Sequence, residues 1–120
     1  MNPINLALRF LLELVALFTM GWWGWGQRGD SWRVVLAAAI PMVAATLWGV
    51  LAVPGDRSRS GSAPVPIPGV LRLVLELAFF ASAVWSLYGL GFSRSAALFG
   101  TIVVVHYLLS FDRVRWLVSQ

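Results

Sequence analysis

Four long runs of apolar residues alternate with short polar segments along the chain. The runs cover Ile4–Trp25, Ser31–Val53, Ile67–Leu90 and Ser95–Phe111. Each is close to the ~20 residues that an α-helix needs to cross the hydrocarbon core of a bilayer. None has the strict alternation of apolar and polar residues that is typical of membrane β-strands, so helices are expected. The pattern predicts an all-α integral membrane protein, a bundle of four transmembrane helices that forms one domain over residues 1–120.

The polar segments between the runs differ in length and composition. Residues 26–30 and 91–94 are short, so they predict two antiparallel helical hairpins. The middle segment, Pro54–Gly69, is rich in proline, glycine, serine and arginine. Because proline cannot continue a helix, we expect an extended loop here.

Composition supports a lipid environment. Of the 120 residues, 59% are hydrophobic and 12% are charged, whereas soluble domains contain about 25% charged residues. The chain contains no cysteine, which excludes disulfides and thiol chemistry. The net charge of +4 could suggest a nucleic-acid partner, but the basic residues are scattered and form no stripe. We therefore expect the lipid bilayer as partner, no nucleic acid and no cofactor.

Arginine placement predicts the orientation. All nine basic residues are arginine, which suggests a bacterium with a GC-rich genome. One side of the predicted bundle would carry Arg57, Arg59, Arg113 and Arg115, and the other Arg28, Arg33 and Arg94. The excess favours the cytoplasm for the first side. The protein is thus expected to be a multi-pass protein of the bacterial inner membrane, with both termini and the 54–69 loop in the cytoplasm.

The first and third helices resemble each other at an offset of 63 residues. The matching pairs include Pro3/Pro66, Arg9/Arg72, Glu13/Glu76 and Trp22/Trp85. The second and fourth helices show no identity at this offset. The match indicates two tandem hairpins in the same orientation, which is a parallel repeat.

Six polar side chains are predicted to share one layer near the cytoplasmic ends of the helices. Residues four apart lie on one helix face, and a rise of ~1.5 Å per residue places the layer about 8–13 Å inside those ends. The six are Arg9, Glu13, Thr46, Arg72, Glu76 and His106. Ionisable groups at this depth cost ~2.5–3.5 kcal/mol each, so they should face the interior and pair.

The layer allows several interpretations. As a functional site it would bind or transport a small solute or a proton, with glutamates accepting protons and His106 acting as a relay. Because four short helices enclose little volume, a pathway would need a homo-oligomer. Alternatively, the pairs are structural salt bridges, and the protein is an accessory module that binds a lipid, a quinone or a membrane protein partner. We assign no catalytic residue and no metal ligand, and an enzyme is the less favoured class.

The central loop carries its own candidates. Asp56, Arg57 and Arg59 are suited to contact anions or lipid headgroups, although a solvated loop would look the same. The blocks Val53-Pro54-Gly55-Asp56 and Ser58-Arg59-Ser60-Gly61, followed by Arg72-Leu73 and Leu75-Glu76, resemble the YrdB family of small bacterial four-helix membrane proteins of unknown function. The resemblance implies four helices in a bacterial membrane and supplies no catalytic residue.

Overall fold

The computed structural model describes residues 2–120, and within them the chain is helical apart from loops and two very short strands. The helices are α1 (Pro3–Trp25), α2 (Trp32–Val50), α3 (Gly69–Gly89), α4 (Ser93–Leu109) and α5 (Phe111–Ser119), and the strands are β1 (Leu51–Ala52) and β2 (Val65–Pro66). The all-α prediction is confirmed. The parallel repeat stays a prediction.

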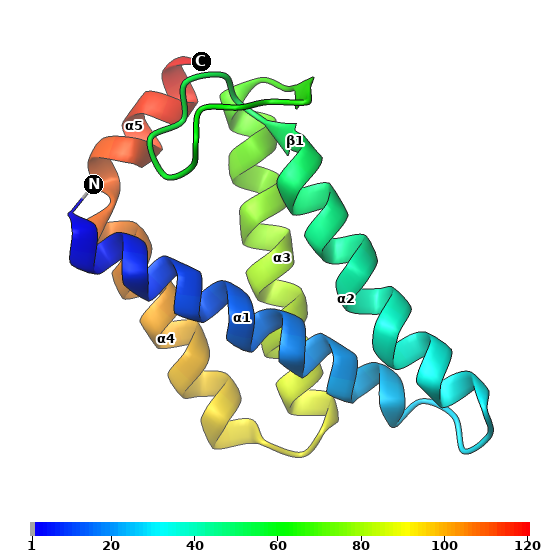
Figure 1. Cartoon of the computed structure of the whole chain (residues 1–120). Helices are drawn as coiled ribbons and strands as arrows, with labels where there is room; N and C mark the ends of the chain where they lie inside the picture. The colour runs from blue at the N-terminus through cyan, green and yellow to red at the C-terminus, as the bar shows by residue number, and fades with distance from the viewer. Residues whose placement is uncertain (1) are drawn as a thin grey trace.

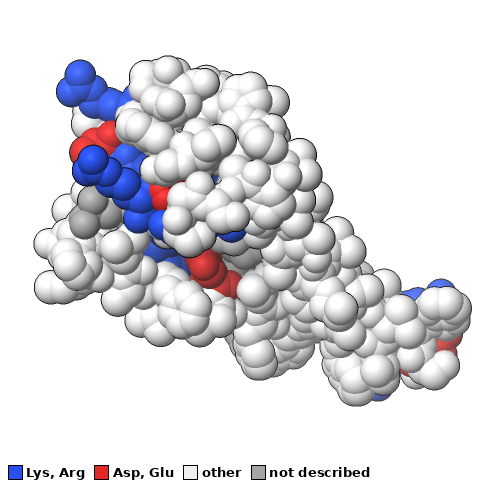
Figure 2. Space-filling model, turned by 45° about the horizontal axis from the view of Figure 1, so that its top comes forward, with Lys and Arg blue, Asp and Glu red and all other residues white. Residues whose placement is uncertain are grey.

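Three helices, α1, α2 and α3, are long and apolar enough to cross a membrane. A fourth span results if α4 and α5 are taken together, although the chain bends by 71° between them. On the face shown in Figure 2, charged side chains gather at two ends of the molecule, with an uncharged surface between them. This distribution is compatible with a membrane protein.

Helix α5 was not predicted. The last helix was expected to run from Ser95 to Phe111, but α4 ends at Leu109 and the chain turns at Ser110 into a separate helix. The serine hydroxyl donates to the carbonyl of His106, which satisfies one of the last carbonyls of α4. The turn brings α5 back over the end of α3 (Figure 1).

Helix α3 lies in the middle of the bundle, between α1, α4 and α5 (Figure 1). The hydrophobic core is formed by α1, α3 and α4, and consists of Leu12, Ala16, Met20, Phe79, Phe80, Ala83, Leu87, Ala96, Phe99 and Val103. Apart from the adjacent Phe79 and Phe80, these positions are three or four residues apart along each helix, as expected for helix faces that pack together.

Helix α2 packs against α1 and diverges from α3 (Figure 1). Gly24 permits the close contact with α1, because a Cβ atom there would lie 2.8 Å from the carbonyl oxygen of Leu36. No residue of α2 is buried. The helix was expected to extend to Val53, but it ends at Val50 because the chain becomes extended to pair with β2.

The central loop is folded rather than free. Strands β1 and β2 pair in parallel, with Leu51 opposite Val65. Between them the chain closes on itself through a hydrogen bond of 3.1 Å from the Gly55 amide to the Gly61 carbonyl. Both glycines have positive φ angles, of 80° and 84°, which other residues rarely adopt. The loop therefore has a defined shape over the end of the bundle.

Candidate functional site

Six charged residues form one cluster beneath the central loop, which we call the charge cluster: Arg9, Glu13, Asp56, Arg72, Glu76 and Arg113. Its centre is Glu76 on α3, whose side chain is 0% exposed. The carboxylate lies 3.0 Å from Arg9, 2.7 Å from Arg72 and 2.7 Å from Arg113. A buried charge is tolerated only when it is paired and hydrogen-bonded, and three guanidiniums meet that condition for Glu76.

Arg113 connects the cluster to the loop. Its Nη2 and Nε donate to the Asp56 carboxylate at 2.6 and 3.0 Å, while Nη1 and Nη2 donate to Glu76. Asp56 is only 1% exposed, so it serves the interior rather than a ligand at the surface. Burial alone would raise the pKa of the Asp56 carboxyl, but the hydrogen bonds and charge of Arg113, with those from Ser58, hold it below its ordinary value.

The two Arg-x-x-x-Glu pairs, alike in sequence, differ in the structure. Arg72 and Glu76 are both 0% exposed and lie 2.7 Å apart. Arg9 and Glu13 are separated by 3.3 Å, and the Glu13 side chain is 21% exposed. Arg9 reaches past its own partner to Glu76. Glu76 is therefore the structural centre, and Glu13 lies at the margin of the cluster.

Two arginines hold the C-terminal end of α2. Arg72 Nη1 donates to the carbonyls of Trp48 and Leu51 at 2.6 and 2.7 Å. Arg59 of the central loop donates to the carbonyls of Trp48 and Gly49 at 3.0 and 2.8 Å. The last carbonyls of a helix lack partners within the helix and carry partial negative charge, so cations stabilise this end.

Trp48 lies beneath the guanidiniums of two arginines of the charge cluster, Arg9 and Arg72. The Cζ atoms of Arg9 and Arg72 are 5.0 and 4.5 Å from the centre of its ring. Both distances are within the range of a cation–π interaction. The far face of the cluster is thus formed by an indole from α2.

A second hydrogen-bonded chain lies beside the cluster. The amide of Asn5 donates to the Ser110 hydroxyl, and its oxygen lies 2.8 Å from Nδ1 of His106. Because the amide oxygen can only accept, His106 carries its proton on Nδ1. Tyr107 donates to Glu76 at 2.7 Å. Neither Asn5 nor Tyr107 was predicted from the sequence as part of the site.

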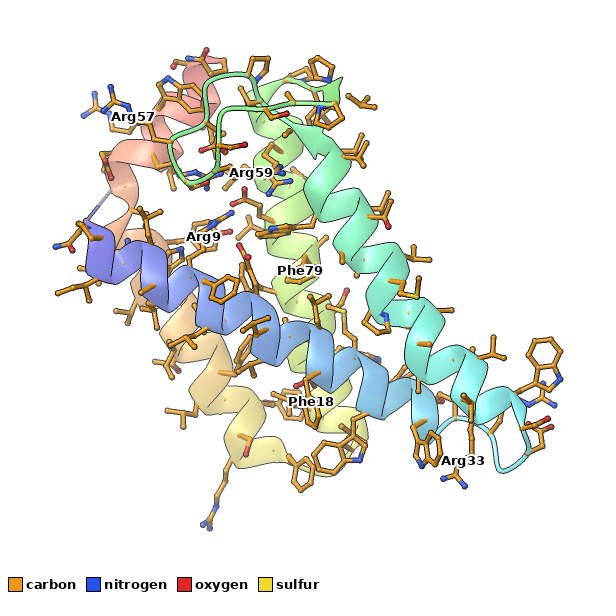
Figure 3. All side chains as sticks on the ribbon, viewed as in Figure 1. Arg9, Phe18, Arg33, Arg57, Arg59 and Phe79 are labelled. Atoms are coloured by element: carbon orange, nitrogen blue, oxygen red, sulfur yellow. The ribbon has the colours of Figure 1, made fainter. Side chains whose placement is uncertain are left out.

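The remaining candidates lie elsewhere. Thr46 was expected in the layer, but it is exposed and its hydroxyl donates to the Met42 carbonyl within α2. Arg57 is exposed and points away from the bundle, whereas Arg9 and Arg59 point inwards (Figure 3). Of the three loop residues proposed to contact anions, two therefore bind the protein itself. Among residues 2–120, no group of three acidic, histidine or cysteine side chains could hold a metal ion.

An apolar groove adjoins the cluster. It has a volume of about 930 Å³ and lies between α2 and α3, and two residues of α1, Met20 and Trp23, also line it. Trp48 and Leu75 line the end next to the charge cluster, and Trp23 and Trp85 line the other end. Ser82 and Ser86 also line it, but their hydroxyls donate to carbonyls of their own helix. The wall is therefore hydrophobic along its length, and charge is present only beyond Trp48.

Comparison with known proteins identifies the family to which the chain belongs. Residues 7–104 match the family described as Protein of unknown function (DUF2568). The chain belongs to the DUF2568 family. It is also 38% identical to the Uncharacterized protein YrdB of Bacillus subtilis (strain 168), over all 120 residues of the chain and 98% of that protein. No solved structure matches it.

The 38% identity confirms the resemblance to YrdB and leaves the chemistry open. The matched range includes Arg9, Asp56, Arg72 and Glu76, and it ends before His106 and Arg113. The similarity to YrdB extends over those two as well. Neither the family description nor the name of YrdB gives an activity.

Proposed function

We propose that this DUF2568 protein is a multi-pass membrane protein that binds a lipid-like amphiphile in the groove between α2 and α3. The observation that supports this function best is the position of the groove. It is apolar throughout, and it ends at an indole that lies beneath two arginines. An amphiphile has the same order of chemistry, a long apolar part that ends in a polar head.

The length of the groove fits an acyl chain. Along α3 the lining runs from Leu75 to Ser86, a distance of about 16 Å at ~1.5 Å per residue. That is about half of the ~30 Å hydrocarbon core of a bilayer. A lipid of a single leaflet would therefore fill the groove with its tail when its head is level with Trp48.

The charge cluster supports this role as a scaffold. Its carboxylates are each paired with arginine, and its members come from α1, α3, α5 and the central loop. Removing either partner from a buried pair costs about 3–5 kcal/mol, so the cluster holds these elements together firmly. The end of the groove at Trp48, where Arg72 of α3 binds the end of α2, is consequently rigid, and beyond it α2 diverges from α3.

The proposal includes an orientation. The end with the charge cluster and the central loop would face the cytoplasm of a bacterium, with both termini on that side, as the arginine distribution predicts. The end of the groove at Trp48 would then lie in the cytoplasmic leaflet of the inner membrane.

Native mass spectrometry in mild detergent tests the binding function. We expect the purified protein to retain one lipid-class molecule per chain, and to regain it after delipidation and incubation with bacterial lipid extract. Protein that stays free of lipid under both conditions would exclude the proposed function.

A second function rests on the exposure of Glu13. This carboxylate is 21% exposed and pairs with one arginine at 3.3 Å, whereas Glu76 is fully buried among three. Glu13 is thus the acid of the cluster best placed to exchange a proton or bind a small cation, within a homo-oligomer that supplies the rest of a pathway. Glu13→Gln should then abolish pH-dependent flux in liposomes, and absence of flux from the unmodified protein would rule this function out.

A further inference from the structure

We infer that the amphiphile carries an anionic head of the phosphate type, bound by the free edges of Arg9 and Arg72. This inference rests on the proposed function, because it assigns a headgroup to the molecule whose tail fills the groove. It concerns the end of the groove where Trp48 separates the apolar wall from the charge cluster.

Within the part of the chain that the structure describes, both guanidiniums have a terminal nitrogen without a hydrogen bond, and in Arg9 this is true of both terminal nitrogens, because Nη2 lies near Glu76 as an ion pair only. Arg9 uses Nε for Glu13 and places Nη2 3.0 Å from Glu76. Arg72 uses Nε for Glu76 and Nη1 for two backbone carbonyls. Among residues 2–120, Nη1 of Arg9 and Nη2 of Arg72 are buried and meet no hydrogen-bond acceptor. A buried donor without an acceptor costs free energy, so both favour an additional acceptor group.

The two arginines that carry the free nitrogens meet at Trp48. Both guanidiniums stack on the ring of Trp48, at 5.0 and 4.5 Å from its centre. Arg9 is 2% exposed and Arg72 is 0% exposed, so water competes little for these donors. The same indole lines the groove. A head that follows its tail along the groove arrives at the ring on which both guanidiniums stack. Neither arginine lines the groove, so the indole has to turn aside for the head to meet one donor from α1 and one from α3.

The charges around this point favour an anion. Arg9, Arg72 and Arg113 are matched in number by Glu13, Asp56 and Glu76. Arg59 adds a further positive charge at the end of α2, where it binds carbonyls and no carboxylate. The region thus has an excess of one positive charge. Arginine donors match the spacing of phosphate oxygens, and such bonds are stronger than those between neutral groups.

Competition between two matched lipids tests the headgroup. Delipidated protein is incubated with equal amounts of phosphatidic acid and diacylglycerol that have the same acyl chains, and bound lipid is quantified by native mass spectrometry. We expect at least about tenfold preference for phosphatidic acid, the ratio that one or two charge-assisted hydrogen bonds provide. Excess inorganic phosphate should not displace it, because phosphate lacks the tail.

Two variants locate the preference. Arg9→Gln removes one of the donors and should reduce the preference to about twofold. Arg57→Gln removes an exposed arginine at the same end of the molecule and should leave it unchanged. If Arg9→Gln does not fold, the comparison of the two lipids on the unmodified protein still decides whether the bound head is anionic.

The outcomes separate the two proposals. Equal binding of both lipids overturns the anionic head and leaves the groove function standing. Binding of neither lipid overturns the groove function itself. A preference that Arg57→Gln removes as fully as Arg9→Gln, or displacement by inorganic phosphate alone, also overturns the inference, since the site would then be a surface charge effect or a site for free oxyanion.

Discussion

Arg113 of α5 and Glu76 of α3, which are 37 positions apart in the chain, are joined by hydrogen bonds of 2.9 and 2.7 Å. The same guanidinium binds Asp56 of the central loop. One side chain thus fastens the loop and the terminal helix to the middle helix of the bundle. This relationship makes the stability of the protein depend on a residue outside every predicted span of the sequence.

Replacement of Arg113 should therefore be costly. Arg113→Gln leaves Glu76 and Asp56 short of a partner in a buried setting, and we expect a loss of about 3–5 kcal/mol in the free energy of unfolding. Arg115→Gln is the matched control, because Arg115 lies on the same helix and is exposed. Chemical unfolding in detergent, followed by circular dichroism, measures both. Similar losses in the two variants would contradict the role of Arg113.

Acid should weaken the same connection. The pKa of Asp56 is lower in the folded protein than in the unfolded chain, so its contribution to stability is complete above the unfolded value of about 4 and is lost as the pH falls through the folded value. Melting temperatures between pH 7 and pH 3 should fall more steeply for the unmodified protein than for Asp56→Asn. Asp30→Asn, at an exposed position, should keep the unmodified slope. Parallel profiles for all three proteins would count against this assignment.

Gly69 fixes the position of α5. A Cβ atom at Gly69 would lie 1.7 Å from the carbonyl oxygen of Leu117, so the backbone of α5 would have to move. We expect Gly69→Ala to destabilise the protein by about 1–3 kcal/mol or more. Gly49→Ala, which meets nothing within 4 Å inside helix α2, should be neutral or slightly stabilising. Thermal unfolding of the two variants tests this, and an unaffected Gly69→Ala protein would show that α5 does not dock there.

The orientation can be tested by cysteine labelling, because the chain contains no cysteine of its own. Gly29→Cys and Ser60→Cys introduce thiols at exposed loop positions at opposite ends of the bundle. In intact cells a membrane-impermeant maleimide should label position 29, and it should label position 60 only after permeabilisation. The reverse pattern would place both termini outside.

Hydrophobic periodicity and length were sufficient to predict that the four apolar segments form helices, since a run of about twenty apolar residues has few alternatives to a helix. They could not reveal α5, whose nine residues include Asp112, Arg113 and Arg115. Periodicity and length also could not predict how α2 is rotated about its own axis. Thr46 has the depth expected of the layer, but depth along a helix does not determine which way a side chain faces.

The sequence predicted the ion pairs of the charge cluster that lie within one helix, but not those that join different elements. Spacing of four residues predicted that Arg9 pairs with Glu13 and Arg72 with Glu76, and both pairs form. The contacts across the bundle, from Glu76 to Arg113 and from Arg113 to Asp56, depend on how the loop and α5 fold back. The only signal for them was charge: an arginine after the last span and an aspartate in a loop on the same side.

The proposed function depends on lipid binding in the groove between α2 and α3. The most direct test is whether lipid is still bound when a substitution fills the groove. Ala78 lines the groove and is exposed, so Ala78→Trp places an indole where the tail would lie. Ala97 is exposed on α4 and is not among the residues that line the groove, so Ala97→Trp is the matched control. Native mass spectrometry should find lipid retained by the unmodified protein and by Ala97→Trp, and lost from a folded Ala78→Trp. Equal lipid retention by the two variants would contradict the claim.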